Sequence, residues 1–242
     1  MIEWQDQAVV LSVRGHGETG GIASLLTRQH GRAAGYVYGA VSNRMRGVLE
    51  PGNIVSVTWR AKGEGQLGNF TLELEKSHAA VVMDDPLKLT ALQSACTLVD
   101  KTLPEGEKHE GVYEGFCALL AAFENDIWAP AYIYWELGLL KELGFGLDLG
   151  QCAATGTTED LIYVSPKSGR AVSGPAGFIY KEKMLAMPAF LRGEAAFEPA
   201  DILDGLKLTG HFFLHRVFAV HTHSNLPDAR LRLEAKFLQK CA

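Results

Sequence analysis

Apolar and polar residues alternate with a period of two over residues 7–76, as they do in strands that bury one face. In the first run, Val9, Leu11 and Val13 share a face. Turn residues separate the runs, at Gly15-His16-Gly17, His30-Gly31, Pro51-Gly52-Asn53 and Gly63-Glu64-Gly65. The pattern predicts about five strands and a small barrel, because closure removes exposed strand edges. An OB-fold is favoured, and an SH3-like barrel fits the same pattern.

From residue 84 onward the apolar spacing becomes helical. Asp84-Asp85-Pro86 is typical of a helix start, with an Asp cap and Pro in the first turn. Further helices are expected at 112–123, 130–143, 199–220 and 227–240. A short hairpin is expected around the turn at 166–169. The chain is therefore predicted to be α+β, with an OB-fold domain at 1–80, a helical domain at 81–242 and a hairpin inserted at 150–178.

Composition excludes several classes of protein. The 242 residues are 47% hydrophobic and 21% charged, which is ordinary for a soluble globular protein. No apolar run approaches the roughly 18 residues of a membrane span, and no secretory signal is visible. The four cysteines lie far apart without a CxxC pair, which indicates reduced thiols and a cytoplasmic protein.

Charge is unevenly distributed along the acidic chain. The formal net charge of -5 divides into +1 for residues 1–80 and -6 for residues 81–242. Residues 19–49 contain four arginines and no Asp or Glu. Arginines without neighbouring carboxylates are available to phosphates, so this strip predicts a nucleic-acid surface.

The expected contact residues lie at strand ends, at outward positions or in the loop predicted at 42–47. Tyr36 and Tyr38 share a strand face on which bases could stack. The basic residues of this barrel surface are Arg14, Arg28, Arg32, Arg44, Arg46, Arg60 and Lys62. A second basic set on the last two helices comprises Lys207, Arg216, Arg230, Arg232, Lys236 and Lys240, of which the first four are the expected contact residues. The alternative interpretation is a solvated surface with ordinary core aromatics, which suits Trp59.

Other motifs carry little chemistry. Residues 15–20 match G-x-G-x-x-G, but a strand pattern follows and no carboxylate appears until Glu50, so a hairpin is favoured over a dinucleotide site. A second alternative is a metalloenzyme site built from His211, His215, His221 and His223. No nucleophile elbow, P-loop or paired-carboxylate motif is present, so no catalytic residue, metal ligand or cofactor is predicted.

Several segments of the sequence resemble the RecO family of bacterial recombination mediators. The resemblance is strongest at residues 9–19 (VVLSVRGHGET) and 24–32 (SLLTRQHGR), continues at 49–53 (LEPGN) and returns at 226–233 (LPDARLRL). It covers essentially the whole chain.

This resemblance implies an N-terminal OB-fold, a helical domain and a zinc-finger-like insertion. It implies binding of single- and double-stranded DNA, strand annealing, and loading of RecA onto DNA coated by single-strand-binding protein. The implied partners are RecR, in some pathways RecF, and the acidic C-terminal tail of the coating protein. It also implies nucleoid association during repair. Here only Cys152 remains of the four zinc cysteines found in some members, so the hairpin is expected to be metal-free.

Three hypotheses follow. The first is a non-enzymatic DNA-binding mediator whose arginines hold phosphates without reading sequence. The second is a protein-interaction adaptor with incidental DNA contact. The third is the histidine-based metalloenzyme.

Overall fold

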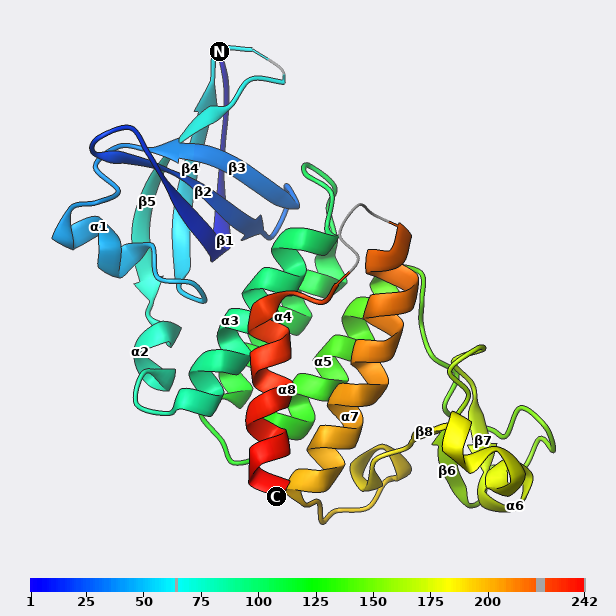
Figure 1. Cartoon of the computed structure of the whole chain (residues 1–242). Helices are drawn as coiled ribbons and strands as arrows, with labels where there is room; N and C mark the ends of the chain where they lie inside the picture. The colour runs from blue at the N-terminus through cyan, green and yellow to red at the C-terminus, as the bar shows by residue number, and fades with distance from the viewer. Residues whose placement is uncertain (64, 221–224, 242) are drawn as a thin grey trace. The chain divides into compact units, whose positions relative to one another are not determined.

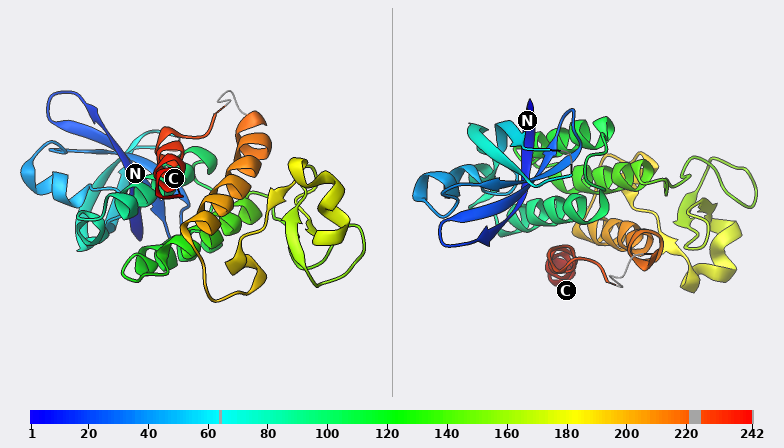
Figure 2. Two further views of the ribbon diagram at one scale, coloured as in Figure 1. Left: turned by 60° about the horizontal axis from the view of Figure 1, so that its bottom comes forward. Right: turned by 90° about the horizontal axis from the view of Figure 1, so that it is seen from above.

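The structure is a computed structural model that describes residues 1–63, 65–220 and 225–241. The chain forms two compact units, Met1–Asn125 and Asp126–Ala242. Figures 1 and 2 show the elements of both, and each unit is described by itself.

The first unit is built on five strands. They are β1 (Ile2–His16), β2 (Gly20–Thr27), β3 (Arg32–Val37), β4 (Ile54–Ala61) and β5 (Gly68–Lys76). Their hydrogen-bonded order is the ring β1-β2-β3-β5-β4, in which β1 pairs with both β2 and β4. The ring is completed by a short parallel contact between β3 and β5 at Gly35–Gly68 and Tyr36–Asn69. The five strands predicted from the alternation are confirmed.

The interior of the sheet departs from the predicted pattern in β1. Ala8 and Val10 join the buried cluster, together with Ala23 and Leu25 of β2. The register between β1 and β2 shifts between Val10 and Ser12. A bulge changes which side chains face inward, so the prediction that Val9, Leu11 and Val13 share one face is wrong.

Four helices complete the first unit: α1 (Asn43–Val48), α2 (His78–Val82), α3 (Pro86–Thr102) and α4 (Glu110–Ala122). Helix α3 begins as its sequence predicts, with the Asp85 side chain accepting hydrogen bonds from the backbone of Leu87 and Lys88. It packs against β1 and β2. Asp100 accepts hydrogen bonds there from the hydroxyls of Ser12 and Ser24. One end of the outer sheet face is therefore covered by α3.

The second unit contains three long helices packed side by side (Figure 1): α5 (Trp128–Glu142), α7 (Pro199–Phe212) and α8 (Asp228–Cys241). Helix α7 continues into a π-helical turn, η3 (Phe213–Val217), and a short 3-10 turn, η4 (Phe218–Val220). The helices predicted near 130–143, 199–220 and 227–240 are confirmed, with small differences at their ends.

A small sheet with order β7-β6-β8 completes the second unit. Its strands are β6 (Leu161–Val164), β7 (Ala171–Ser173) and β8 (Leu185–Ala186). Helix α6 (Gly174–Gly177) and the 3-10 segment η1 (Phe178–Lys183) connect β7 to β8. A further 3-10 turn, η2 (Ala189–Arg192), follows β8. The antiparallel pairing of β6 with β7 confirms the predicted hairpin.

The two compact units meet in sequence at residues 125 and 126, whereas the predicted domains divide at residue 80. Helices α2, α3 and α4 therefore belong with the strands as one packed body. The functional division at residue 80, and the separate status of residues 150–178, stay predictions.

Candidate nucleic-acid interface

The exposed outer face of β1, β2 and β3 brings a basic and an aromatic side chain into one row. Arg14 lies opposite Ile22, and Ile22 lies opposite Tyr36. Side chains directly opposite one another on paired strands lie on the same face of the sheet. His16 and Tyr38 lie two residues beyond Arg14 and Tyr36, so they extend this face toward the β1–β2 hairpin.

Ring contacts hold the aromatic part of this surface together. The Tyr36 ring lies edge-on to Tyr38, with centroids 4.8 Å apart, and edge-on to His16 at 6.0 Å. Gly20 makes room for the Tyr36 ring, because a Cβ at Gly20 would lie 1.8 Å from its hydroxyl oxygen. Tyr38 is 71% exposed, so its ring is open to a ligand.

Arg44 and Arg46 lie on helix α1, so the loop predicted at 42–47 is wrong. Ser42 caps this helix by accepting a hydrogen bond from the Met45 backbone. Both arginines are exposed. Just before α1, the Val41 N–H donates to the Thr19 carbonyl at 3.3 Å, which ties the segment to the β1–β2 hairpin. We call Arg14, His16, Tyr36, Tyr38, Arg44 and Arg46 the outer-face cluster.

Three other predicted arginines have carboxylate partners supplied from elsewhere in the chain. Arg28 lies 3.3 Å from Glu114, and Arg60 lies 2.9 Å from Glu3. The Arg60 hydrogen bond lowers the pKa of the exposed Glu3 carboxyl. Arg32 donates to the Leu103 carbonyl at 2.9 Å and lies 3.7 Å from Asp100. The premise that the arginines of residues 19–49 lack internal partners is therefore wrong for Arg28 and Arg32, and Arg60, outside that stretch, is paired as well.

The expected C-terminal contact residues divide into exposed members and one buried arginine. Lys207 on α7 and Arg232 on α8 are exposed, and Arg216 donates a hydrogen bond to the Lys167 carbonyl. Arg230 is 0% exposed, so it cannot touch DNA in this fold, and the expectation that it would is wrong. Among the basic residues predicted on the strands of the first unit, Lys62 follows β4 and is exposed.

Arg230 is instead the centre of a buried polar network in the second unit. Its Nε donates to Glu136 Oε1 at 2.6 Å and its Nη2 donates to Glu136 Oε2 at 3.1 Å. Thr209 and Tyr132 also donate to Glu136. Burial would lower the pKa of Arg230, but the Glu136 carboxylate outweighs it and raises that pKa. The sequence feature that indicates this network is Glu136, a carboxylate within the apolar helix pattern of 130–143.

Of the four histidines of the predicted metal site, the structure describes His211 and His215. The His211 and His215 rings lie 4.4 Å apart, and His211 Nε2 donates to the Pro166 carbonyl at 3.2 Å. Burial lowers the pKa of His211. His221 and His223 lie outside the described residues. Within the residues that the structure describes, no group of three or more His, Cys, Asp or Glu side chains is arranged to hold a metal ion.

The thiol of Cys152, near the inserted hairpin, accepts hydrogen bonds from Ser173. The backbone N–H and the hydroxyl of Ser173 lie 3.3 and 3.4 Å from Cys152 Sγ. Burial would raise the pKa of this thiol, but hydrogen bonds, first from Ser173, outweigh it and lower the pKa to about 6. A single thiol cannot supply a tetrahedral zinc site.

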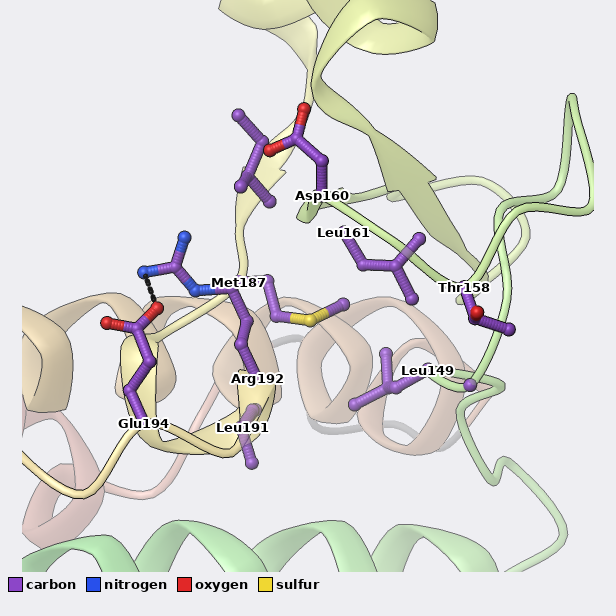
Figure 3. Close-up of a pocket in the computed structure, with 10 residues that line it drawn as sticks. Leu149, Thr158, Asp160, Leu161, Met187, Leu191, Arg192 and Glu194 are labelled. Carbon is purple, nitrogen blue, oxygen red and sulfur yellow. Dashed lines mark ion pairs between the residues drawn. The ribbon is translucent and has the colours of Figure 1, made fainter.

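A cavity of about 470 Å³ lies beside β6 in the second unit (Figure 3). Leu149, Leu161 and Met187 give it apolar walls. Arg192 and Glu194 at its rim form an ion pair of 2.8 Å, which Figure 3 marks. This internal pairing makes the cavity a poor site for phosphate.

Among the described helices, none combines the length and apolar character needed to cross a membrane.

Comparison with known proteins gives matches along most of the chain. The family model for the Recombination protein O N terminal matches residues 1–78, and that for the Recombination protein O C terminal matches residues 83–225. A DNA repair protein RecO of Rhodospirillum centenum is 51% identical over 238 residues, covering 98% of this chain and 95% of that protein. Those of Caulobacter vibrioides and Rhodospirillum rubrum are 47% and 44% identical, each covering 96% of this chain and 93% and 95% of the relatives.

Proposed function

Because the chain belongs to the RecO family of DNA repair and recombination proteins, we propose that it is a non-enzymatic mediator that binds single- and double-stranded DNA. The observation that carries the proposal is the outer-face cluster, in which Tyr36 and Tyr38 are in ring contact, Arg14 shares their sheet face, and Arg44 and Arg46 are exposed on helix α1. Phosphate neutralisation by arginine supplies affinity without reading sequence, and aromatic rings supply stacking surfaces for unpaired bases.

We further propose that the five-stranded ring is an OB-fold. The strand order β1-β2-β3-β5-β4 and the parallel β3–β5 contact support this assignment. OB-folds bind oligonucleotides on the face of their second and third strands and on the loops after strands one and four. The position of Tyr36 on β3, and of Lys62 in the loop after β4, supports such a site.

Annealing is the activity that this surface would support. A basic surface that holds two polyanions by their phosphates leaves the base edges free to pair. The proposed partners are RecR, the acidic tail of single-strand-binding protein and, through RecR and RecF, the RecA filament. Such a protein would act in the cytoplasm at the nucleoid, with a metal-free, zinc-finger-like hairpin in its second unit.

An adaptor role has one observation in its favour. Phe178, Ile179 and Tyr180 in η1 are 65%, 83% and 57% exposed, and Lys181 lies over the Phe178 ring at 5.4 Å. Three consecutive exposed apolar side chains are typical of a protein-docking surface. If docking were the whole function, partner binding would survive loss of the outer-face cluster and DNA binding would be dispensable.

The first test measures affinity for labelled single-stranded DNA at several salt concentrations. Changing Arg44 and Arg46 to Ala should weaken binding and reduce the slope of log K against log salt by about 1.4, at about 0.7 per lost phosphate contact. The matched control is Arg60→Ala, because Arg60 already pairs with Glu3 and should change the slope less. Affinity that ignores both salt and the double substitution would contradict the proposal.

The second test separates a mediator from a simple binder. Two complementary labelled strands are mixed without ATP, and duplex formation is followed by fluorescence. The wild-type protein should accelerate annealing, and the Arg44→Ala, Arg46→Ala variant should lose most of the acceleration. Tight DNA binding without any acceleration would exclude annealing from the function.

A further inference from the structure

Three flat rings, those of Trp4, His30 and Trp59, stack on one another in the first unit. The Trp4 and His30 ring centroids lie 4.3 Å apart with planes 11° from parallel, and the Trp4 and Trp59 centroids lie 5.5 Å apart at 14°. Trp4 and Trp59 are half-buried and pack against the interior cluster of the sheet. The stack therefore lines the mouth of the strand ring, where small-molecule sites are common in β-barrels.

Each ring of the stack is held in place by its own contacts. Trp59 Nε1 donates to the Ala34 carbonyl at 3.3 Å, and its indole lies against Gly68, where a Cβ would approach within 2.2 Å. His30 Nδ1 lies 3.1 Å from Asp6 Oδ2. Trp4 lies directly opposite Trp59 on the neighbouring strand. These contacts orient the three planes before any ligand arrives, which lowers the entropic cost of binding.

A cavity of about 300 Å³ opens beside the rings, and Trp4, His30 and Trp59 are all in its wall. The turn at Glu105 and Gly106 also lines this cavity. That turn is fixed to β3, since Gly106 N–H donates to the Arg32 carbonyl at 2.8 Å and Glu105 accepts from the Ala34 N–H at 3.2 Å. Hydrogen bonds therefore hold both the rings and this turn in the cavity lining.

The charged groups around this cavity already have partners inside the protein. Arg32 is engaged by the Leu103 carbonyl and by Asp100, and Glu105 by the Ala34 N–H. Asp6 accepts from the backbone of Gln7 and Gln29 as well as facing His30. Neither a phosphate nor a cation finds an uncompensated countercharge here. The exposed Gln29 amide instead offers both a donor and an acceptor.

We propose that the mouth of the sheet, at Trp4, His30 and Trp59, binds one unpaired nucleobase of single-stranded DNA. The three rings already stack on one another, so the base stacks on the ring surface that lines the cavity, and the neutral Gln29 amide matches its edge. The proposal rests on the DNA-binding function proposed above and adds a strand preference to it. A base inside a duplex must leave its stack before it can enter, and that costs free energy, so the mouth favours single strands.

The test compares two labelled oligonucleotides of equal length, oligothymidylate and its abasic analogue, which carry the same phosphates. The wild-type protein should bind the base-containing strand at least about fivefold more tightly, as expected for one stacked base. Trp4→Leu should reduce this advantage severalfold while leaving affinity for the abasic strand unchanged, and Trp4→Phe should retain more of it than Trp4→Leu does. Phe145→Leu removes an exposed ring outside every site and should change nothing.

A second variant covers the possibility that Trp4→Leu fails to fold. His30 lies in the β2–β3 turn with its side chain 38% exposed, so His30→Leu removes one ring with little loss of core packing. It should also reduce the base-dependent advantage.

Three results would overturn the proposal. Equal affinity of the wild type for both strands excludes a base site but leaves phosphate binding intact. An advantage that survives Trp4→Leu and His30→Leu but is lost in Tyr38→Leu places stacking on the outer-face cluster instead. Failure to bind either strand overturns the DNA-binding function itself.

Discussion

Two arginines on α8 show how burial decides the role of a side chain. Arg232 is exposed, whereas Arg230, two residues earlier, is 0% exposed and bonded to Glu136. Residues two apart on a helix face different directions, so one can enter the core while the other faces solvent. Residue type alone had placed both in the same basic surface.

Substitution of Arg230 should therefore act on stability. Arg230→Met leaves the Glu136 carboxylate buried without its partner, and removal of one member of a buried pair costs about 3–5 kcal/mol. Urea unfolding should show this loss, whereas Arg232→Met should stay within about 0.5 kcal/mol of the wild type. Under native conditions the folded Arg230→Met protein should bind DNA with wild-type affinity. A loss below about 1 kcal/mol would show that Glu136 finds other compensation.

His78 should make stability depend on pH. It is 4% exposed, and burial, followed by the charge of Lys76, lowers its pKa from 6.5, while Glu124 opposes the shift. The unfolded chain then binds this proton more readily than the folded one. Stability should be full above about pH 6.5 and fall as the pH drops below it.

The measurement is the urea midpoint between about pH 7.5 and about pH 5.5. The midpoint should fall less steeply in His78→Gln than in the wild type. His16→Gln, which changes an exposed histidine, should follow the wild type. Parallel curves for all three proteins would remove His78 as the cause.

At the scale of elements, the sequence predicted correctly those features that depend on only a few neighbouring residues. The Asp85 cap, the β1–β2 hairpin at the glycines and the β6–β7 turn all formed as predicted. Helix α1 was missed because six residues carry too little periodicity. The bulge in β1 was missed because it depends on pairing with β2.

Asp85→Ala tests the start of α3 as an element. The side chain satisfies two backbone N–H groups at the helix start, so its loss should cost about 1 kcal/mol, with a range of about 0.5–2. Thermal or urea unfolding measures the change. Asp84→Ala is the matched control, because it removes the same charge from the preceding exposed position. Equal losses in both variants would indicate a charge effect and argue against capping.

At the scale of the whole molecule, the packed division at residue 125 predicts how fragments behave. A fragment of residues 1–125 should fold cooperatively, whereas a fragment of residues 1–80 should not. The shorter fragment lacks Asp100 and Leu103, which bond Ser12 and Arg32. It also lacks α3, which packs against β1 and β2, where Leu26 is 0% exposed in the complete chain. Thermal melts followed by circular dichroism distinguish the two. A cooperative melt of the shorter fragment at the temperature of the longer one would show that the strands are self-sufficient.

The sequence by itself determined the α+β class, the five strands, most of the long helices and the family. Alternation, helical spacing, caps and turn residues are local properties, so they can be read without knowing the neighbours. Only the tertiary structure decided which arginines are available. Glu114, Asp100 and Glu3 approach Arg28, Arg32 and Arg60 across long sequence separations. Charge compensation acts through space, so a strip without local carboxylates still acquired partners. The stack of Trp4, His30 and Trp59 could not be predicted for the same reason, because the three rings come from separate segments of the chain.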